Sequence, residues 1–374
     1  MKFTVSSSTL LHRIQVIGKV IAAKNQMAIL EYFLLDVKGN NLTITASDLE
    51  TTISTTITID NGDGDVTIAL PSKLLSESLK EFGDQPLVFD INPENLAVEL
   101  KTETGRFNFI GQNSEEFPEE PALGEEILTA TVKTGTLATG ISKTIFATAV
   151  DDGRPMMTGI FFKFENESLT FVATDAHKLV RLVNTATTND MEASFILPKK
   201  SASLLKNILG GLNDEAKISF DDKNIVFEME GYRMVCRQIN GKYPNYNSVI
   251  PTNNPYEIII DRQTFANAIK RIIPFANQAS QLIKLTIESG SITLLAQDID
   301  FSNAAQEKIS CQFEGDPINI GFKATLLADI LSNFSSDEVR LQLADPSRAG
   351  IILPSENEEN EDLLMLLMPM LIND

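Results

Sequence analysis

Few side chains in this chain could carry out acid–base or nucleophilic chemistry. The sequence has two histidines, His12 and His177, and His177 lies two positions after Asp175, which makes this pair the candidate for acid–base catalysis. The two cysteines, Cys236 and Cys311, lie in different strand-like segments without metal-ligand spacing, so we expect buried free thiols. The sequence shows no nucleophile motif, phosphate-binding loop or metal-binding cluster. We therefore expect no catalytic residue, no metal and no cofactor.

The aspartate beside His177 belongs to a recurring pattern. An apolar strand ends in Asp48, in Asp175 and in Asp298, which lie 127 and 123 positions apart. A residue that stands at the same place in every copy indicates a turn-forming role rather than catalysis. The segment Ala176-His177-Lys178 is particular to the second copy, and partner binding is best sought there.

Other residues recur with nearly the same offset. Leu10, Leu137 and Phe265 each follow an opening apolar strand and lie 127 and 128 positions apart. Phe117-Pro118 returns as Tyr243-Pro244, 126 positions later. Independent anchors with matching offsets indicate three copies of one domain. We place the boundaries in the acidic, proline-bearing stretches between copies, which gives domains of residues 1–126, 127–253 and 254–374.

Each copy divides into two halves, and each half reads as a strand, a helix and three further strands. In the first copy Leu10, Ile14 and Ile17 mark the opening helix by their helical spacing. Lys38-Gly39-Asn40-Asn41 and Asn61-Gly62-Asp63-Gly64 are turn sequences between strands. Two helices per domain, packed on one face of antiparallel sheets, form an α+β arrangement.

The composition is that of an ordinary globular protein. The 374 residues are 43 % hydrophobic and 22 % charged, and the chain is long enough for two or three domains with their own cores. No apolar run approaches the length of a membrane span, and the first residues alternate like a strand rather than forming a signal-peptide core. We therefore expect a cytoplasmic protein with no membrane partner.

The charge distribution is more informative than the net charge. A net charge of −20 argues by itself against nucleic acid, because phosphate binding requires positive charge. The six expected helices nevertheless carry twelve basic residues and only three acids, Glu77, Glu81 and Asp329. The basic residues are Arg13, Lys19, Lys73, Lys80, Lys143, Lys199, Lys200, Lys206, Arg262, Lys270, Arg271 and Lys323. A basic surface made only of helices would contact phosphates without reading base sequence.

Two other interpretations compete with DNA binding. Lysines on solvated helix faces are common, which would make the chain an acidic three-domain interaction or adhesion protein. His177 and Asp175 would instead be the centre of a hydrolase.

Short motifs in order along the whole chain carry a family resemblance. They are Met1-Lys2-Phe3-Thr4-Val5, Ser47-Asp48-Leu49-Glu50, Ala173-Thr174-Asp175-Ala176-His177-Lys178-Leu179, Gly241-Lys242-Tyr243-Pro244-Asn245-Tyr246 and Met368-Pro369-Met370. With these motifs the chain resembles the bacterial DNA polymerase III β sliding clamps. The resemblance implies a head-to-tail homodimer of six domains, a ring whose twelve inner helices encircle double-stranded DNA without sequence specificity. It also implies that the ring tethers the DNA polymerase III catalytic subunit, the clamp loader, other DNA polymerases and repair factors.

The resemblance further implies a pocket that binds a short partner peptide, a glutamine followed by leucine and phenylalanine residues. Its wall would be Met157, Thr174, Ala176, His177, Lys178, Leu179, Pro244, Ser248, Val249, Ser347, Ala349, Leu366, Met368, Pro369 and Met370. Leucine and methionine would form an adaptable apolar groove, and Thr174, His177 and Lys178 would supply its polar ends. This chain departs from the family where Ala176 replaces the usual glycine, where Lys178 and Ser248 replace arginines, and where residues follow Met370.

The same resemblance assigns residues to DNA and to the dimer. The expected DNA contacts are Lys24, Arg154, Lys200, Lys206, Lys270 and Arg271. The expected dimer contacts are Phe107 and Phe109 in the first domain, which would meet the third domain near Pro274 and Phe275. Both phenylalanines would equally suit an ordinary core.

Overall fold

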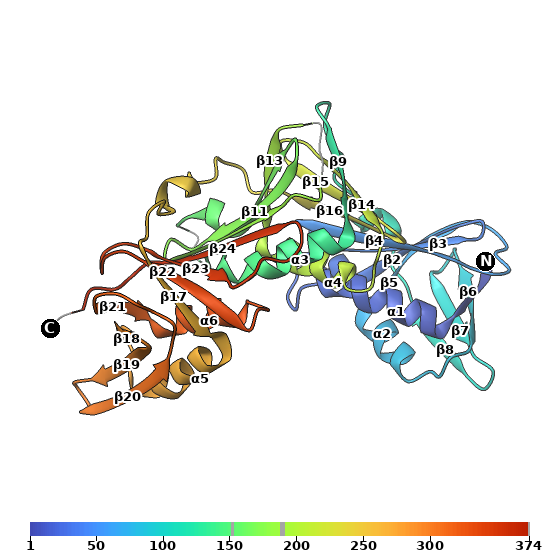
Figure 1. The fold of residues 1–374 in the computed structure, drawn as a ribbon. Helices are drawn as coiled ribbons and strands as arrows, with labels where there is room; N and C mark the ends of the chain where they lie inside the picture. The colour runs from blue at the N-terminus through green and yellow to red at the C-terminus, as the bar shows by residue number, and fades with distance from the viewer. Residues whose placement is uncertain (151–152, 188–190, 373–374) are drawn as a thin grey trace. The chain divides into compact units, whose positions relative to one another are not determined.

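The computed structural model describes residues 1–150, 153–187 and 191–372 (Figure 1). These residues divide into two compact units, one of residues 1–138 and 200–238 and the other of residues 139–199 and 239–374. The central repeat therefore contributes one half to each unit.

Each repeat has the expected two halves of strand, helix and three strands, so this prediction is confirmed. Across the described residues the α-helices are α1 (Ser7–Ile17), α2 (Ser72–Lys80), α3 (Thr134–Thr144), α4 (Lys199–Leu209), α5 (Arg262–Ile272) and α6 (Ala324–Ser332). Short 3-10 helices are η1 (Gly18–Val20), η2 (Ala28–Glu31), η3 (Ser114–Glu116), η4 (Ile145–Ala147), η5 (Pro155–Met157), η6 (Tyr246–Val249) and η7 (Ile273–Phe275).

The first unit contains two antiparallel sheets. The eight-stranded sheet has, in spatial order, β5 (Val66–Pro71), β2 (Tyr32–Lys38), β3 (Asn41–Ser47), β4 (Thr51–Thr58), β16 (Tyr232–Arg237), β15 (Asn224–Met229), β14 (Glu215–Phe220) and β9 (Leu128–Lys133). The four-stranded sheet has β1 (Lys2–Ser6), β6 (Pro86–Asn92), β7 (Ala97–Lys101) and β8 (Arg106–Ile110).

The second unit repeats this plan. Its eight-stranded sheet has the order β13 (Ala193–Pro198), β10 (Gly159–Glu165), β11 (Ser168–Thr174), β12 (Lys178–Asn184), β24 (Glu361–Leu367), β23 (Gly350–Pro354), β22 (Glu338–Leu343) and β17 (Tyr256–Asp261). Its four-stranded sheet has β20 (Asn303–Ser310), β19 (Ser291–Asp298), β18 (Leu282–Glu288) and β21 (Ile318–Lys323).

The two eight-stranded sheets are joined by the same rule. In each, the last strand of a first half pairs with the last strand of the second half of the following repeat: β4 with β16, and β12 with β24. Two corresponding strands remain in the described residues: β8, the last strand of the second half of the first repeat, and β20, the last strand of the first half of the third repeat. Each lies at an open edge of a four-stranded sheet.

The helices and strands form where the sequence patterns place them. In α1, Leu10, Ile14 and Ile17 are buried, and the hydroxyl of Ser6 caps the helix by accepting a hydrogen bond from the backbone N–H of Thr9. In β2 the buried residues alternate with partly exposed ones, as expected for a strand with one face on the core. The α+β fold with two helices per repeat is therefore confirmed.

The expectation that all six helices are basic is wrong for one of them. Helix α6 carries Asp329 and no lysine or arginine, because Lys323 is its N-cap residue. Lys19 lies in η1, and Glu81 is the C-cap residue of α2. The α-helices thus hold ten of the twelve basic residues and two of the three acids.

No helix in the described part of the chain is long and apolar enough to cross a membrane.

Candidate functional site

The recurring aspartates form the same turn in each repeat. The Oδ1 atom of Asp175 accepts hydrogen bonds from the backbone N–H groups of His177 and Lys178, at 2.9 and 2.8 Å. Asp48 binds the backbone at two and three positions further on in the same way, and Asp298 does so at 3.1 and 3.4 Å. These side chains replace backbone hydrogen bonds of a tight turn. The predicted turn-forming role is confirmed.

The turn of the second repeat holds a buried ion pair. The Nζ atom of Lys178 lies 2.7 Å from Oδ2 of Asp175, and only 6 % of the lysine side chain is exposed. Burial alone raises the pKa of the Asp175 carboxyl, but hydrogen bonds from the Lys178 ammonium and from the two backbone N–H groups outweigh burial, so the pKa lies below its usual range. Both carboxylate oxygens of Asp175 are therefore occupied by partners other than the imidazole of His177.

The three side chains expected at the polar end of the pocket differ in exposure. Thr174 is buried, and its hydroxyl donates to the carbonyl oxygen of Lys178 at 2.7 Å. Lys178 is buried in its ion pair, whereas His177 is exposed. Ala176 has a φ of 74°, in the left-handed region that favours glycine. Thr174 and Lys178 thus stabilise the turn, and His177 presents its side chain to solvent.

An apolar cluster lies beside this turn. Leu179, Ala349 and Leu366 belong to one group of packed buried residues, together with Tyr243. The ring of Tyr243 stacks on Phe161, with centroids 4.7 Å apart and 11° between the planes. Burial raises the pKa of the Tyr243 hydroxyl. Sequence reasoning used Tyr243 as a repeat anchor and missed its place in this cluster.

Further expected wall residues lie on loops and short helices of the same unit. Met157 ends η5, Ser248 and Val249 lie in η6, and Val249 is 52 % exposed. Residues after β24 complete the set, because the backbone N–H of Met368 donates to the carbonyl oxygen of His177 at 2.9 Å. Met368 is 41 % exposed, and Pro369 and Met370 are partly exposed. The turn and the C-terminal segment therefore lie side by side, with apolar side chains available to a ligand.

The six residues expected to contact DNA are all exposed. Lys200 in α4 forms an ion pair with Asp48, and the Nε of Arg271 in α5 donates to Glu307 at 3.0 Å. Lys206 and Lys270 lie on α4 and α5, Lys24 lies in the loop after η1, and Arg154 is the N-cap residue of η5. Exposed ion pairs are weak, so phosphate can compete with Glu307 for Arg271, whereas the Asp48 carboxylate that binds Lys200 is largely buried.

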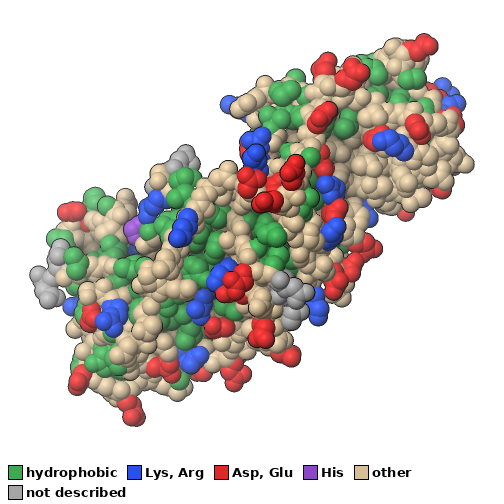
Figure 2. Space-filling view, turned by 90° about the horizontal axis from the view of Figure 1, so that it is seen from above, with side chains coloured by type: hydrophobic (Ala, Val, Ile, Leu, Met, Phe, Trp, Pro, Cys, Tyr) green, Lys and Arg blue, Asp and Glu red, His purple; other side chains and the backbone are tan. Residues whose placement is uncertain are grey.

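Charged side chains of both signs are interspersed on the face shown in Figure 2. Oppositely charged side chains on neighbouring strands form ion pairs, such as Lys101 with Asp90 and Arg181 with Asp362, both at 2.8 Å.

The expected dimer contacts lie at the two open sheet edges or next to them. Phe107 in β8 is 38 % exposed, and its ring contacts Phe82 with centroids 4.9 Å apart. Phe109 is buried in its own domain, while Ile110 at the end of β8, which sequence reasoning did not select, is 69 % exposed. Pro274 is exposed and Phe275 is 41 % exposed, both in η7.

Neither cysteine is arranged for reactivity. Burial raises the pKa of the Cys236 thiol to about 12, against a smaller opposing effect of a hydrogen bond with Ser201. Cys311 is also free but only partly buried, so the expectation of burial is wrong for this residue. In the described residues no cluster of histidine, cysteine, aspartate and glutamate could hold a metal ion.

This fold is that of a sliding clamp. A crystal structure of the DNA polymerase III β subunit from Pseudomonas aeruginosa matches over the full length of both chains, with a TM-score of 0.93 at 23 % identity. A sliding clamp from Bartonella birtlesii bound to griselimycin matches over the full length of both chains, with a TM-score of 0.91 at 25 % identity.

Sequence comparison identifies the family. Three family models match this chain: the N-terminal domain of the DNA polymerase III β subunit at residues 1–121, the central domain at 131–245 and the C-terminal domain at 247–370. The chain belongs to the DNA polymerase III β subunit family. The beta sliding clamp of Bacillus subtilis is 24 % identical over 380 residues, which cover 99 % of each chain.

Proposed function

We propose that this chain is a DNA sliding clamp. Two copies would form a ring that encircles duplex DNA without sequence specificity and tethers the DNA polymerase III catalytic subunit, the clamp loader, other polymerases and repair factors. Family membership supports the proposal. One structural observation carries it: β8 and β20 each lie at the edge of a four-stranded sheet, and they are the two strands that the joining rule of the eight-stranded sheets leaves without a partner.

The pairing pattern of the two eight-stranded sheets predicts which strand would pair with β20. Because β4 pairs with β16 and β12 pairs with β24, β20 of the third repeat would pair with β8 of a first repeat. That first repeat can belong to a second copy of the chain. The two four-stranded sheets would then join into an eight-stranded sheet built by the same rule as the other two. A contact between different surfaces of identical chains is head-to-tail, and it closes into a ring when the rotation allows. We propose Phe107, Ile110 and Phe275 as apolar contacts at this seam, and Phe109 as a core residue that supports it.

The helices supply the DNA contact in this proposal. Ten basic residues against two acids give the α-helices a positive charge within a chain of net charge −20. Phosphate contacts of this kind are sequence-independent and salt-sensitive. Ring topology, rather than affinity, would then retain the protein on DNA.

The apolar cluster beside the Asp175 turn is the proposed peptide site. His177, Val249 and Met368 are its exposed members, and Leu179 and Leu366 form its buried support. An extended peptide with leucine and phenylalanine side chains suits such a groove. We propose that the chain has no catalytic activity, acts in the cytoplasm, and has domains of residues 1–126, 127–253 and 254–374.

The decisive experiment compares retention on circular and linear DNA. After loading by a clamp loader onto nicked circular DNA, the protein should stay bound through gel filtration and should be lost once the circle is cut. The same preparation should sediment at twice the monomer mass. Equal retention on circular and linear DNA would contradict encirclement, and a hydrolase would instead show turnover that His177→Ala abolishes.

A further inference from the structure

We propose that Ile372 and Gly321 are positioning residues that hold the Met368–Met370 segment against the peptide site. The inference rests on the proposed function, because it concerns the wall of that site. Ile372 belongs to the residues that follow Met370, where this chain departs from the family pattern.

The segment is fixed at two points. At one end the backbone N–H of Met368 donates to the carbonyl oxygen of His177 at 2.9 Å. Two residues later the N–H of Met370 donates to the carbonyl oxygen of Gly321 at 2.8 Å, in an isolated antiparallel bridge with β21. The segment therefore connects the Asp175 turn of the central repeat to the sheet of the third repeat.

Gly321 makes the second attachment possible. A Cβ atom at this position would lie 2.7 Å from the carbonyl oxygen of Met370 and 2.8 Å from Cδ1 of Leu282. It would also lie 3.0 Å from Cγ1 of Ile372. Contacts of this length with backbone are repulsive, so any side chain here would push the segment away from β21.

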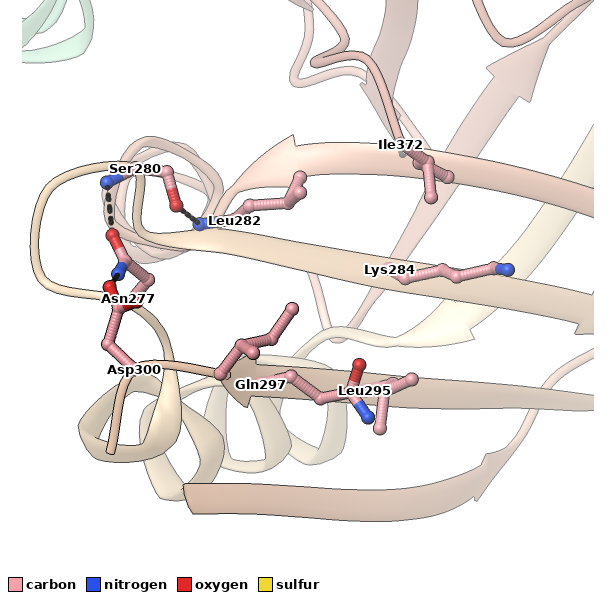
Figure 3. Close-up of a pocket in the computed structure, with 9 residues that line it drawn as sticks. Asn277, Ser280, Leu282, Lys284, Leu295, Gln297, Asp300 and Ile372 are labelled. Atoms are coloured by element: carbon pink, nitrogen blue, oxygen red, sulfur yellow. Dashed lines mark hydrogen bonds between the residues drawn. The ribbon is translucent and has the colours of Figure 1, made fainter. Parts of the chain in front are cut away.

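Ile372 adds a side-chain contact to this attachment. Its side chain is partly buried and lines a groove of about 480 Å³ together with Leu282 of β18 and Leu295 of β19. Figure 3 shows Ile372 reaching from the C-terminal segment toward these two strands. The preceding residue, Leu371, is 84 % exposed. The alternation means that Ile372 is the residue of this pair that packs on the sheet.

The arrangement couples a residue outside the peptide site to the site itself. Only Leu371 separates Ile372 from Met370, so loss of the Ile372 contact would weaken the attachment of Met370 to β21 and leave it to the backbone hydrogen bond with Gly321. Met368 and Pro369 would then be held only by the backbone hydrogen bonds of Met368 to His177 and of Met370 to Gly321. A ligand would have to order the segment on binding, which lowers its affinity.

The experiment uses the full-length protein and a labelled peptide carrying a glutamine followed by leucine and phenylalanine residues. I372S should raise the peptide Kd by about three- to tenfold, because substitutions that act through a neighbouring element have effects of this size. L371S removes an equally apolar side chain that is exposed, and its Kd should stay within about twofold of the wild type. I372L should restore binding, and G321A should weaken it at least as much as I372S, with G83A as the control glycine because nothing lies within 4 Å of a Cβ there.

Hydrogen exchange gives a second measurement. The Met370 amide should exchange faster in I372S and G321A than in the wild type, while the Met368 amide changes less. Equal Kd values for I372S and wild type, or unchanged exchange at Met370, would overturn the positioning inference and leave the proposed function intact. Absence of peptide binding by the wild type would overturn the proposed peptide site, and exchange at Met370 would then test the attachment alone.

Discussion

Lys178 and Asp175 form a buried ion pair within one turn, whereas the corresponding Asp48 of the first copy pairs with Lys200 of α4, whose side chain is about half exposed. The Nζ–Oδ2 distance is 2.7 Å, and the lysine side chain is 6 % exposed. The pair therefore distinguishes the second repeat chemically as well as by sequence, and it lies one residue from the exposed His177.

Removing one partner should destabilise the protein. Lys178→Ala leaves the Asp175 carboxylate poorly solvated, and loss of one member of a buried pair costs about 3 kcal/mol. Denaturant unfolding at neutral pH measures the change in the free energy of unfolding. Lys217→Ala removes an exposed lysine of a surface pair and should change that energy by less than about 1 kcal/mol.

The contribution of Asp175 should depend on pH in the acidic range. Because its pKa is lower in the folded protein than in the unfolded chain, its contribution is fully present above the usual carboxyl pKa of about 3.9 and is lost as the pH falls through the folded pKa. The difference in unfolding free energy between the wild type and Asp175→Asn should be constant near neutral pH and should shrink below about pH 4. A difference that grows on acidification would contradict this assignment.

Ala176→Gly should stabilise the turn slightly. A left-handed alanine costs about 1–2 kcal/mol, and the greater flexibility of glycine in the unfolded chain offsets about 0.5–1 kcal/mol of the relief. We expect a gain of up to about 1 kcal/mol in the free energy of unfolding, measured with denaturant. The same change at Ala97, a strand residue without a positive φ, should destabilise, and a loss at both positions would show that the turn is not strained.

The peptide site should depend on its two methionines. Met368→Ala combined with Met370→Ala should weaken binding of a polymerase-tail peptide by ~2 kcal/mol or more, since truncations at the centre of an interface have this effect. Isothermal titration calorimetry measures the loss. Leu371→Ala is the matched control because this residue is 84 % exposed. Unchanged affinity in the double variant would place the groove elsewhere.

The exposed lysines should act in loading onto DNA. Lys24→Glu combined with Lys206→Glu should slow clamp loading relative to the wild type, the difference should shrink as salt rises because salt screens these charges, and the sedimentation of the dimer should not change. Lys200 is better replaced by alanine, because a glutamate would stand beside the largely buried Asp48 carboxylate. Unaffected loading at moderate salt would show that these lysines do not face the duplex.

The open edge of β8 should be needed for the dimer. Ile110→Lys places a charge on an edge residue that is 69 % exposed, so the monomer should fold normally while sedimentation shows half the mass. Leu371→Lys introduces the same charge at a comparably exposed position and should leave the dimer intact. Dimers of unchanged stability in Ile110→Lys would argue against the β8–β20 seam.

Much of the fold could be predicted from local patterns. The spacing of Leu10, Ile14 and Ile17 fixes α1, and the recurrence of Asp48, Asp175 and Asp298 predicted a turn that all three copies form. These features depend on residues a few positions apart, and such interactions are visible in sequence. The helix boundaries were less accurate: Lys323 is the N-cap residue of α6 instead of belonging to it, and apolar spacing alone defines a helix end only to within one or two residues.

The sequence by itself determined three repeats, their α+β halves, the sorting of basic residues to helices and the family resemblance. Tertiary structure decided how the repeats join, because the pairing of β12 with β24 brings together strands about 180 residues apart. It also decided that Lys178 and Thr174 are buried in the turn while His177 is exposed, and that the C-terminal segment is attached to Gly321. Such assignments depend on burial and on hydrogen bonds between distant segments, which no local pattern of residue types encodes.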